Sequence, residues 1–183
     1  MVTFQDIQTA YYMVAATGVL IAAIFYVLNM RETTKNRKAT LTNNLMQFIT
    51  STERAKIGME LLSMEWEDFD DFYRKYDSTV NPDNYAKRMV HWGYYEILGV
   101  QYRTGLLDVE TIYAVSGVSI VNMWLRFKPI IEEYRKFDYG KDFYQNWEYL
   151  ANDLARIKAV RDPSWKGSKS HIRSEEYDGA FKK

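Results

Sequence analysis

The sequence predicts an all-α protein in which one N-terminal transmembrane helix continues into a cytoplasmic bundle of about five to six helices. Residues 7–30 contain no charged side chain. The 183-residue chain has three prolines and nine glycines, too few for many short strands and turns. Beyond the charge-free run, apolar residues recur at spacings of three and four, which is typical of helices packed along one face.

Residues 7–30 form the predicted transmembrane helix, after a short N-terminal extension of residues 1–6. Twenty-four helical residues extend about 36 Å, enough to cross a hydrocarbon core of about 30 Å. The run is apolar on every side, and Tyr11, Tyr12 and Tyr26 lie near its ends, where amphipathic rings suit the headgroup region. A cleaved signal peptide would carry basic residues before its apolar core, and residues 1–6 contain none.

Basic residues follow the predicted span at once. Four of them lie in the predicted juxtamembrane neck, residues 31–40: Arg31, Lys35, Arg37 and Lys38. Residues 1–30 contain no Lys or Arg. The positive-inside bias therefore predicts a single-pass protein of the cell membrane, with the N-terminus outside and residues 31–183 in the cytoplasm. We expect the four cations to contact the surface of the lipid bilayer.

Two features are compatible with a homo-oligomer. Gly18 and Ala22 lie one turn apart in the span, and small residues at this spacing let two helices approach closely. Further on, apolar or small residues recur at alternating spacings of four and three and form a seam: Leu41, Leu45, Phe48, Thr52, Ala55, Met59 and Leu62. The Leu41–Leu62 seam suits either a coiled coil with a second copy or packing on the bundle. Because Thr52 and Ala55 are weak coiled-coil residues, packing within the chain is favoured from Leu45 onward.

Capping signals divide the predicted helical domain, residues 41–160. Ser63 is the predicted N-cap of a short helix whose aromatic residues face inward: Trp66, Phe69, Phe72, Tyr73 and Tyr76. Asn81-Pro82 is a strong start signal for the central helix, which is expected to run to about Thr104 and to end at Gly105.

Asp108 is the predicted cap of the next helix, which runs through Trp124. Small residues at 116–119 predict a close contact between helices. Pro129 is expected to break the helix and start a short one over 130–136. The last helix presents one apolar face: Phe143, Trp147, Leu150, Leu154 and Ile157. Residues 161–183 are predicted to form a flexible tail.

No pattern of catalytic or cofactor-binding residues is present. The chain has no cysteine, and its two histidines, His91 and His171, are eighty residues apart, so no metal site and no cofactor is expected. No glycine-rich phosphate loop or nucleophile elbow occurs, and we expect no enzymatic activity. The acids at 65–71 suit a helix N-terminus better than a calcium loop. Equal numbers of basic and acidic residues, 24 of each, argue against a nucleic-acid partner.

A few polar residues fall in otherwise apolar predicted helices. His91, Glu96 and Arg103 lie in the central helix, and Arg135 is a possible partner for a buried carboxylate. These four residues are candidates for an interior polar network, in which each buried charge needs a partner.

Several short motifs occur in one order along the chain: Trp66-Glu67-Asp68-Phe69-Asp70-Asp71-Phe72, Asn81-Pro82, Tyr94-Tyr95-Glu96-Ile97-Leu98-Gly99, Gly105-Leu106-Leu107, Trp124 and Lys128-Pro129-Ile130-Ile131. In this order they resemble an uncharacterised prokaryotic family, archaeal members included, of small single-span membrane proteins classed as a domain of unknown function. The resemblance covers roughly residues 10–158. It implies one N-terminal span and a cytoplasmic helical domain, and it implies no activity.

Three function classes remain. The first is a membrane-anchored helical interaction or scaffold protein, whose partners are the lipid bilayer and a protein still to be identified. The second is an accessory subunit of a larger membrane complex, which docks through its span. The third is a membrane-tethered ligand-binding or signalling domain with a pocket inside the bundle.

Overall fold

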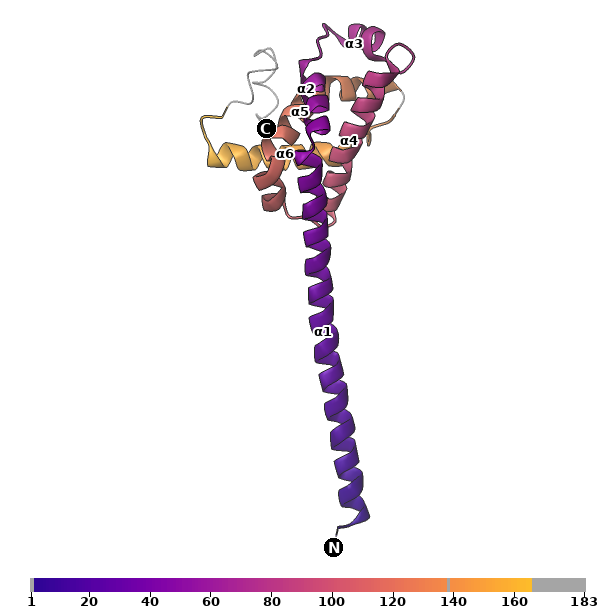
Figure 1. The fold of residues 1–183 in the computed structure, drawn as a ribbon, viewed down its shortest axis with the longest axis vertical. Helices are drawn as coiled ribbons and strands as arrows, with labels where there is room; N and C mark the ends of the chain where they lie inside the picture. The colour runs from indigo at the N-terminus through magenta and orange to yellow at the C-terminus, as the bar shows by residue number, and fades with distance from the viewer. Residues whose placement is uncertain (1, 138, 166–183) are drawn as a thin grey trace. The chain divides into compact units, whose positions relative to one another are not determined.

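The computed structural model describes residues 2–137 and 139–165, and this part of the chain contains six helices and no strand (Figure 1). The helices are α1 (Phe4–Thr50), α2 (Thr52–Ser63), α3 (Phe69–Tyr76), α4 (Pro82–Arg103), α5 (Val109–Phe137) and α6 (Gln145–Arg161). The predicted all-α class is confirmed. The predicted tail lies outside the described residues from position 166 on, and so does His171.

The chain divides into two units, one up to Leu41 and one from Thr42 onward. The first unit is helical from Phe4, three residues before the predicted span. Thr3 and Asp6 explain this start: the Thr3 hydroxyl accepts the Asp6 N–H at 3.3 Å, and the Asp6 carboxylate accepts the Thr3 N–H at 2.9 Å. The reciprocal pair satisfies donors that a helix leaves open at its N-terminus.

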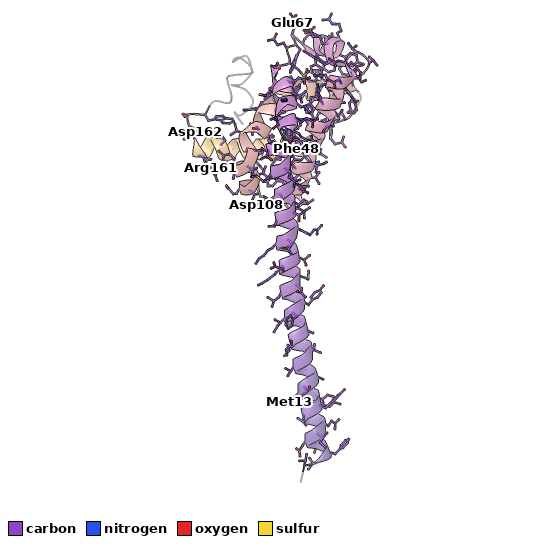
Figure 2. The ribbon with its side chains drawn as sticks, in the orientation of Figure 1. Met13, Phe48, Glu67, Asp108, Arg161 and Asp162 are labelled. Carbon is purple, nitrogen blue, oxygen red and sulfur yellow. The ribbon has the colours of Figure 1, made fainter. Side chains whose placement is uncertain are left out.

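Helix α1 contains a candidate membrane span. Its most apolar stretch of 18 residues has a mean hydropathy of 2.1, and none of that stretch is buried. Met13, labelled in Figure 2, is one of its exposed side chains. The Thr17 hydroxyl donates to the Met13 carbonyl at 2.8 Å, so this polar group is satisfied within its own helix. By length and composition, this helix can cross a membrane.

The second unit begins with the last turns of α1. Leu45 is fully buried there, and the Phe48 ring stacks on Tyr94 of α4 with 3.3 Å between ring centroids. The prediction that this segment packs within the chain is confirmed at these two residues. Ser51 then adopts an extended conformation (φ −70°, ψ 118°), and its hydroxyl accepts the Arg54 N–H at 3.4 Å as the cap of α2.

The break at Ser51 makes the continuous Leu41–Leu62 seam wrong. A serine hydroxyl competes for backbone donors and favours a new helix start over helix continuation. Beyond the break the chain presents another face: Thr52, Ala55 and Met59 are exposed, whereas Leu61 is fully buried. A homo-oligomer through this segment stays a prediction.

Helix α3 starts five residues later than predicted from Ser63. Ser63 is the last residue of α2, and its hydroxyl donates to the Glu60 carbonyl at 2.9 Å. Asp68 is the cap instead, accepting the Asp71 N–H at 2.8 Å. Asp and Ser are equally good caps, so packing decides between them, and here the start at Asp68 buries Phe72 completely.

The start of the central helix is confirmed. The Asn81 side chain accepts the Asn84 N–H at 3.1 Å, and Pro82 occupies the first helical position of α4. Gly105, just beyond the end of α4, has a φ of 71°, the left-handed conformation that glycine adopts without strain.

Helix α5 runs through Pro129 without a break, so the predicted short helix at 130–136 is wrong as a separate element. Phe127, Ile130 and Ile131 are buried around the proline, and packing on both sides holds the chain helical there. The distortion lies at Ser116 instead (φ −156°, ψ 17°). A Cβ on Gly117 would lie 2.9 Å from the Tyr113 ring of the same helix and 3.5 Å from Leu154 Cδ2 of α6, an ordinary contact distance, so the especially close contact between helices predicted for 116–119 is not seen at Gly117.

The core of the second unit lies where α4, α5 and α6 meet. Trp92, Trp124 and Trp147, one from each helix, are fully buried. The ring centroids of Trp124 and Trp147 are 5.2 Å apart, those of Trp92 and Trp147 6.3 Å. Leu150 and Leu154 of the predicted last helix are buried with them. The apolar faces that the spacing predicted for α4 and α6 therefore form one aromatic core.

Candidate functional site

Three of the four predicted network residues meet at the N-terminus of α6. The residue before this helix, Tyr144, has a φ of 54°, and its side chain makes no capping hydrogen bond. Glu96 of α4 supplies the cap from another helix. Its Oε1 accepts the Asn146 N–H at 3.2 Å, and its Oε2 accepts the Trp147 N–H at 2.8 Å. A carboxylate at this position also suits the positive end of the helix dipole.

Asn146 brings Arg103 into the same cluster. Its side-chain amide donates to Glu96 Oε1 at 2.6 Å, and its side-chain oxygen accepts from Arg103 Nη1 at 2.7 Å. Gly99 lies between Glu96 and Arg103 in α4, and a Cβ added to it would be 2.2 Å from the Asn146 carbonyl oxygen. Helix α4 therefore holds Asn146 in three ways: by the Glu96 carboxylate, by the close backbone contact at Gly99 and by the Arg103 guanidinium.

Arg135 of α5 holds the same segment from a second helix. Its Nη1 is 2.7 Å from Glu148 Oε2, and its Nε donates to the Phe143 carbonyl at 2.9 Å. The guanidinium thus binds both the loop before α6 and its first turn. Glu96, Arg103 and Arg135 all serve to position α6, which is a structural task.

His91 does not join these three residues. It is 3% exposed, and its ring lies 5.4 Å from the Phe48 ring and 5.8 Å from the Tyr95 ring, centroid to centroid. A Cβ on Gly58 of α2 would be 3.4 Å from His91 Nε2. Burial, together with the smaller effect of the nearby Arg54 cation, lowers the pKa of His91 to about 4. His91 is therefore neutral near pH 7 and lies between α1, α2 and α4.

Two more polar groups accompany His91 around Phe48, which Figure 2 labels. The Arg54 guanidinium lies 4.4 Å from the centre of the Phe48 ring, and burial raises the pKa of Tyr94 to about 12. Each of these three residues has one buried atom without a hydrogen-bond partner among the described residues: Arg54 Nη1, His91 Nδ1 and the Tyr94 hydroxyl. We call this group the Phe48 cluster.

The four predicted membrane-surface residues lie in the first unit. Arg31, Lys35, Arg37 and Lys38 are all exposed on α1. Lys35 Nζ is 4.0 Å from Glu32 Oε2, the one described ion pair of this stretch. An exposed pair at this distance contributes little, so the stretch keeps its positive character.

A buried arginine was missed by sequence reasoning. Arg88 of α4 is fully buried, with its guanidinium 4.7 Å from the Phe72 ring centre and 5.3 Å from that of Trp92. Its Nε donates to Asn84 Oδ1 at 3.0 Å, and its Nη2 donates to the Tyr76 carbonyl. Burial lowers the pKa of Arg88. The spacing of Asn84 and Arg88, one helical turn apart, was the available signal, but surface pairs show the same spacing.

A group of exposed aromatic rings was also missed. The aromatic patch consists of the half-buried Phe69 and exposed Tyr73 of α3, Phe137 at the end of α5, and Tyr139, which is linked to Phe69 through the Tyr134 ring that both contact. The Phe69 ring stacks on Phe137 at 6.0 Å and lies 6.2 Å from Tyr73. Phe137 is 69% exposed, Tyr73 47% and Tyr139 46%. The prediction that the α3 aromatics all face inward is therefore wrong at Tyr73.

Within residues 2–137 and 139–165, no group of three or more His, Cys, Asp or Glu side chains is placed to hold a metal ion. A surface hollow of about 530 Å³ is lined by Asp68, Asp70, Tyr73 and Arg74.

Comparison with known proteins identifies the family. The model of a family described as "Domain of unknown function (DUF4760)" matches residues 13–154. The match includes the apolar part of α1, the whole of α2 to α5, and α6 up to Leu154. No curated protein and no solved structure matches the chain.

Proposed function

The chain belongs to the DUF4760 family, and from this premise we propose that it is a single-pass, membrane-anchored interaction protein without enzymatic activity. The observation that carries the proposal is the unburied apolar stretch of α1, whose mean hydropathy is 2.1. Apolar surface of this length is costly in water and suits a bilayer.

The proposed orientation has the N-terminus outside and the second unit in the cytoplasm. Its support is the charge asymmetry of α1, with no Lys or Arg in residues 1–30 and four exposed cations in residues 31–40. The exposed cations are free to contact anionic lipid at the cytoplasmic surface.

Interaction is the role that the second unit supports best. Glu96, Arg103 and Arg135 are engaged in holding α6, so these three polar residues have structural partners. The aromatic patch, in contrast, leaves large rings exposed, and exposed apolar patches commonly mark binding surfaces.

Carbonate extraction and a paired reporter fusion test the proposal. The full chain, fused at Lys183 to a cytoplasm-active fluorescent protein or to a periplasm-active phosphatase, should remain in the membrane pellet and show fluorescence only. The matched control replaces Ile21 and Phe25 in the span by Glu, which should release the chain to the soluble fraction. Release of the native chain, or mass spectrometry that finds residues 1–30 removed, would contradict the anchor, and phosphatase activity would contradict the orientation.

An accessory subunit of a membrane complex is the alternative in which the span itself docks. A Cβ at Gly18 would meet nothing within 4 Å, so this face of the helix is open to a close approach. Purification in mild detergent should then recover a partner that Gly18→Leu releases.

A ligand-binding or signalling domain is favoured by the Phe48 cluster. Buried polar atoms without partners are costly, and a bound anion would satisfy Arg54, His91 and Tyr94 together. Inorganic phosphate should then raise the melting temperature of the native chain and leave that of Arg54→Gln unchanged.

A further inference from the structure

We propose that the aromatic patch and the acidic turn beside it dock an arginine-rich segment of another protein, an inference that rests on the proposed role in interaction. The acidic turn comprises residues 65–71, between α2 and the first turn of α3, with four exposed acids: Glu65, Glu67, Asp68 and Asp70. Figure 2 labels Glu67, one of them.

The acidic turn and the aromatic patch form one surface. Asp68 and Asp70 line the same hollow of about 530 Å³ as Tyr73 and Arg74. From Tyr73 the rings continue through Phe69 to Phe137, at centroid separations of 6.2 and 6.0 Å. Carboxylates and exposed ring faces are therefore within reach of a single bound segment.

The neighbouring cations neutralise the negative charge of this surface only in part. Arg74 and Lys75 both bind Asp71, the buried acid of the turn, at 3.2 and 2.6 Å. Among the described residues, no ion pair involves Glu65, Glu67, Asp68 or Asp70. Lys75 also interacts electrostatically with Glu67, and Arg74 lines the hollow, so two cations oppose the five acids of residues 65–71 and the surface keeps a net negative charge for a cationic partner.

Arginine matches both halves of this surface. Its planar guanidinium can lie over a ring face and bind a carboxylate through two donors, whereas the lysine ammonium is a point charge. The protein itself contains such contacts: the Arg126 guanidinium lies 4.0 Å from the Trp66 ring centre, and that of Arg88 4.7 Å from Phe72.

Other occupants fit less well. An anionic bilayer surface would be repelled by the four acids. A second copy, paired through a two-fold axis, would bring two identical acidic turns together. Charge complementarity therefore favours a basic protein segment.

Peptide binding to the full chain in phosphatidylcholine nanodiscs tests the inference. The probes are fluorescein-labelled oligo-arginine and oligo-lysine of equal length, followed by fluorescence anisotropy. Because cation–π contacts favour Arg, oligo-arginine should bind about threefold to tenfold more tightly. Both affinities should fall as the salt concentration rises, because salt screens exposed charges.

Variants separate the two halves of the surface. Tyr73→Leu with Phe137→Leu keeps apolar side chains but removes two rings, so the preference for Arg should vanish while oligo-lysine binding is unchanged. Asp70→Asn should weaken both peptides by about threefold, in the range of one exposed ion pair. Glu53→Gln, which removes an exposed acid in the first turn of α2, should change neither affinity.

Equal affinity for the two peptides, or a preference that survives loss of both rings, would overturn the inference. So would a dimer, seen by sedimentation of the native chain, that Tyr73→Leu with Phe137→Leu dissociates, because the occupant would then be a second copy. Melting temperatures of all variants should match that of the native chain. A chain that passes carbonate extraction but shows no Arg preference would refute this docking surface and leave the membrane anchor standing.

Discussion

His91 shows how one buried side chain ties stability to pH. Its pKa in the folded chain is about 4, against an ordinary value of 6.5, so the unfolded chain binds the extra proton more readily. The described groups that face it are the Arg54 cation of α2 and the rings of Phe48 and Tyr95, and none is an acid that could stabilise its charged form.

We therefore expect the contribution of His91 to the free energy of unfolding to be fully present above pH 6.5. The free energy of unfolding should fall by about 3 kcal/mol as the pH drops from 6.5 to 4. His91→Leu should lose less stability over this window than the native chain. Thermal melts of both, followed by circular dichroism at each pH, measure the difference. Parallel losses in the two chains would mean that His91 does not carry this dependence.

Gly99 is the position where a single methyl group should do the most damage. An added Cβ would lie 2.2 Å from the Asn146 carbonyl oxygen and 2.3 Å from its carbonyl carbon. Since backbone atoms cannot rotate away, Gly99→Ala must push α6 from α4 and should cost about 3 kcal/mol or more. Gly93→Ala on the same helix meets nothing within 4 Å and should be neutral or slightly stabilising. Urea titration of both variants tests the contrast.

At the scale of the elements, α6 depends on groups from other helices for its start. Tyr144 gives no side-chain cap, and Glu96 accepts two backbone N–H groups of the first turn. Glu96→Gln should cost about 1–3 kcal/mol, because the amide replaces one acceptor by a donor that faces an N–H. Faster hydrogen exchange confined to the first turn of α6 would locate the loss. Glu53→Gln on α2 is the control, and equal losses in both variants would contradict the capping role.

The start of a helix was predictable where the sequence offers only one good capping residue nearby. Asn81-Pro82 fixed the start of α4, because a cap and a proline at the first turn act together. The cap at Asp68 was not predictable, because Ser63 offered an equally good cap and the choice depends on which rings become buried. The cap at Ser51 was not predictable, because the apolar spacing of the seam continues across it.

The candidate site was predictable in three of its members but not in its arrangement, and His91 lies elsewhere. Glu96, Arg103 and Arg135 were selected as charges within apolar helices, and the structure brings them to one helix end. Their common partner, the segment around Asn146, lies 43 and 50 positions from Arg103 and Glu96 in the chain. Spacing rules within one helix give no information at that separation.

At the scale of the whole molecule, the unit from Thr42 onward has its own core, with Trp92, Trp124 and Trp147 fully buried. A chain of residues 42–165 should therefore fold cooperatively in water without the span. Trp124→Ala should cost it about 3–5 kcal/mol, as for other buried aromatics. Urea unfolding followed by circular dichroism tests both statements, and a loss near zero would mean that the Trp124 ring is not part of the core.

The place of Trp147 in this core has a consequence for synthesis. Trp147 contacts Trp92, Tyr95 and Trp124, all of which leave the ribosome before it does. Chains grow at about 5–20 residues per second, so these three rings are synthesised seconds before Trp147, the residue that completes their packing. A truncated translation product that stops before α6 would keep that aromatic surface open. Such fragments would be targets for chaperones and proteases, and only the nearly finished chain could escape them.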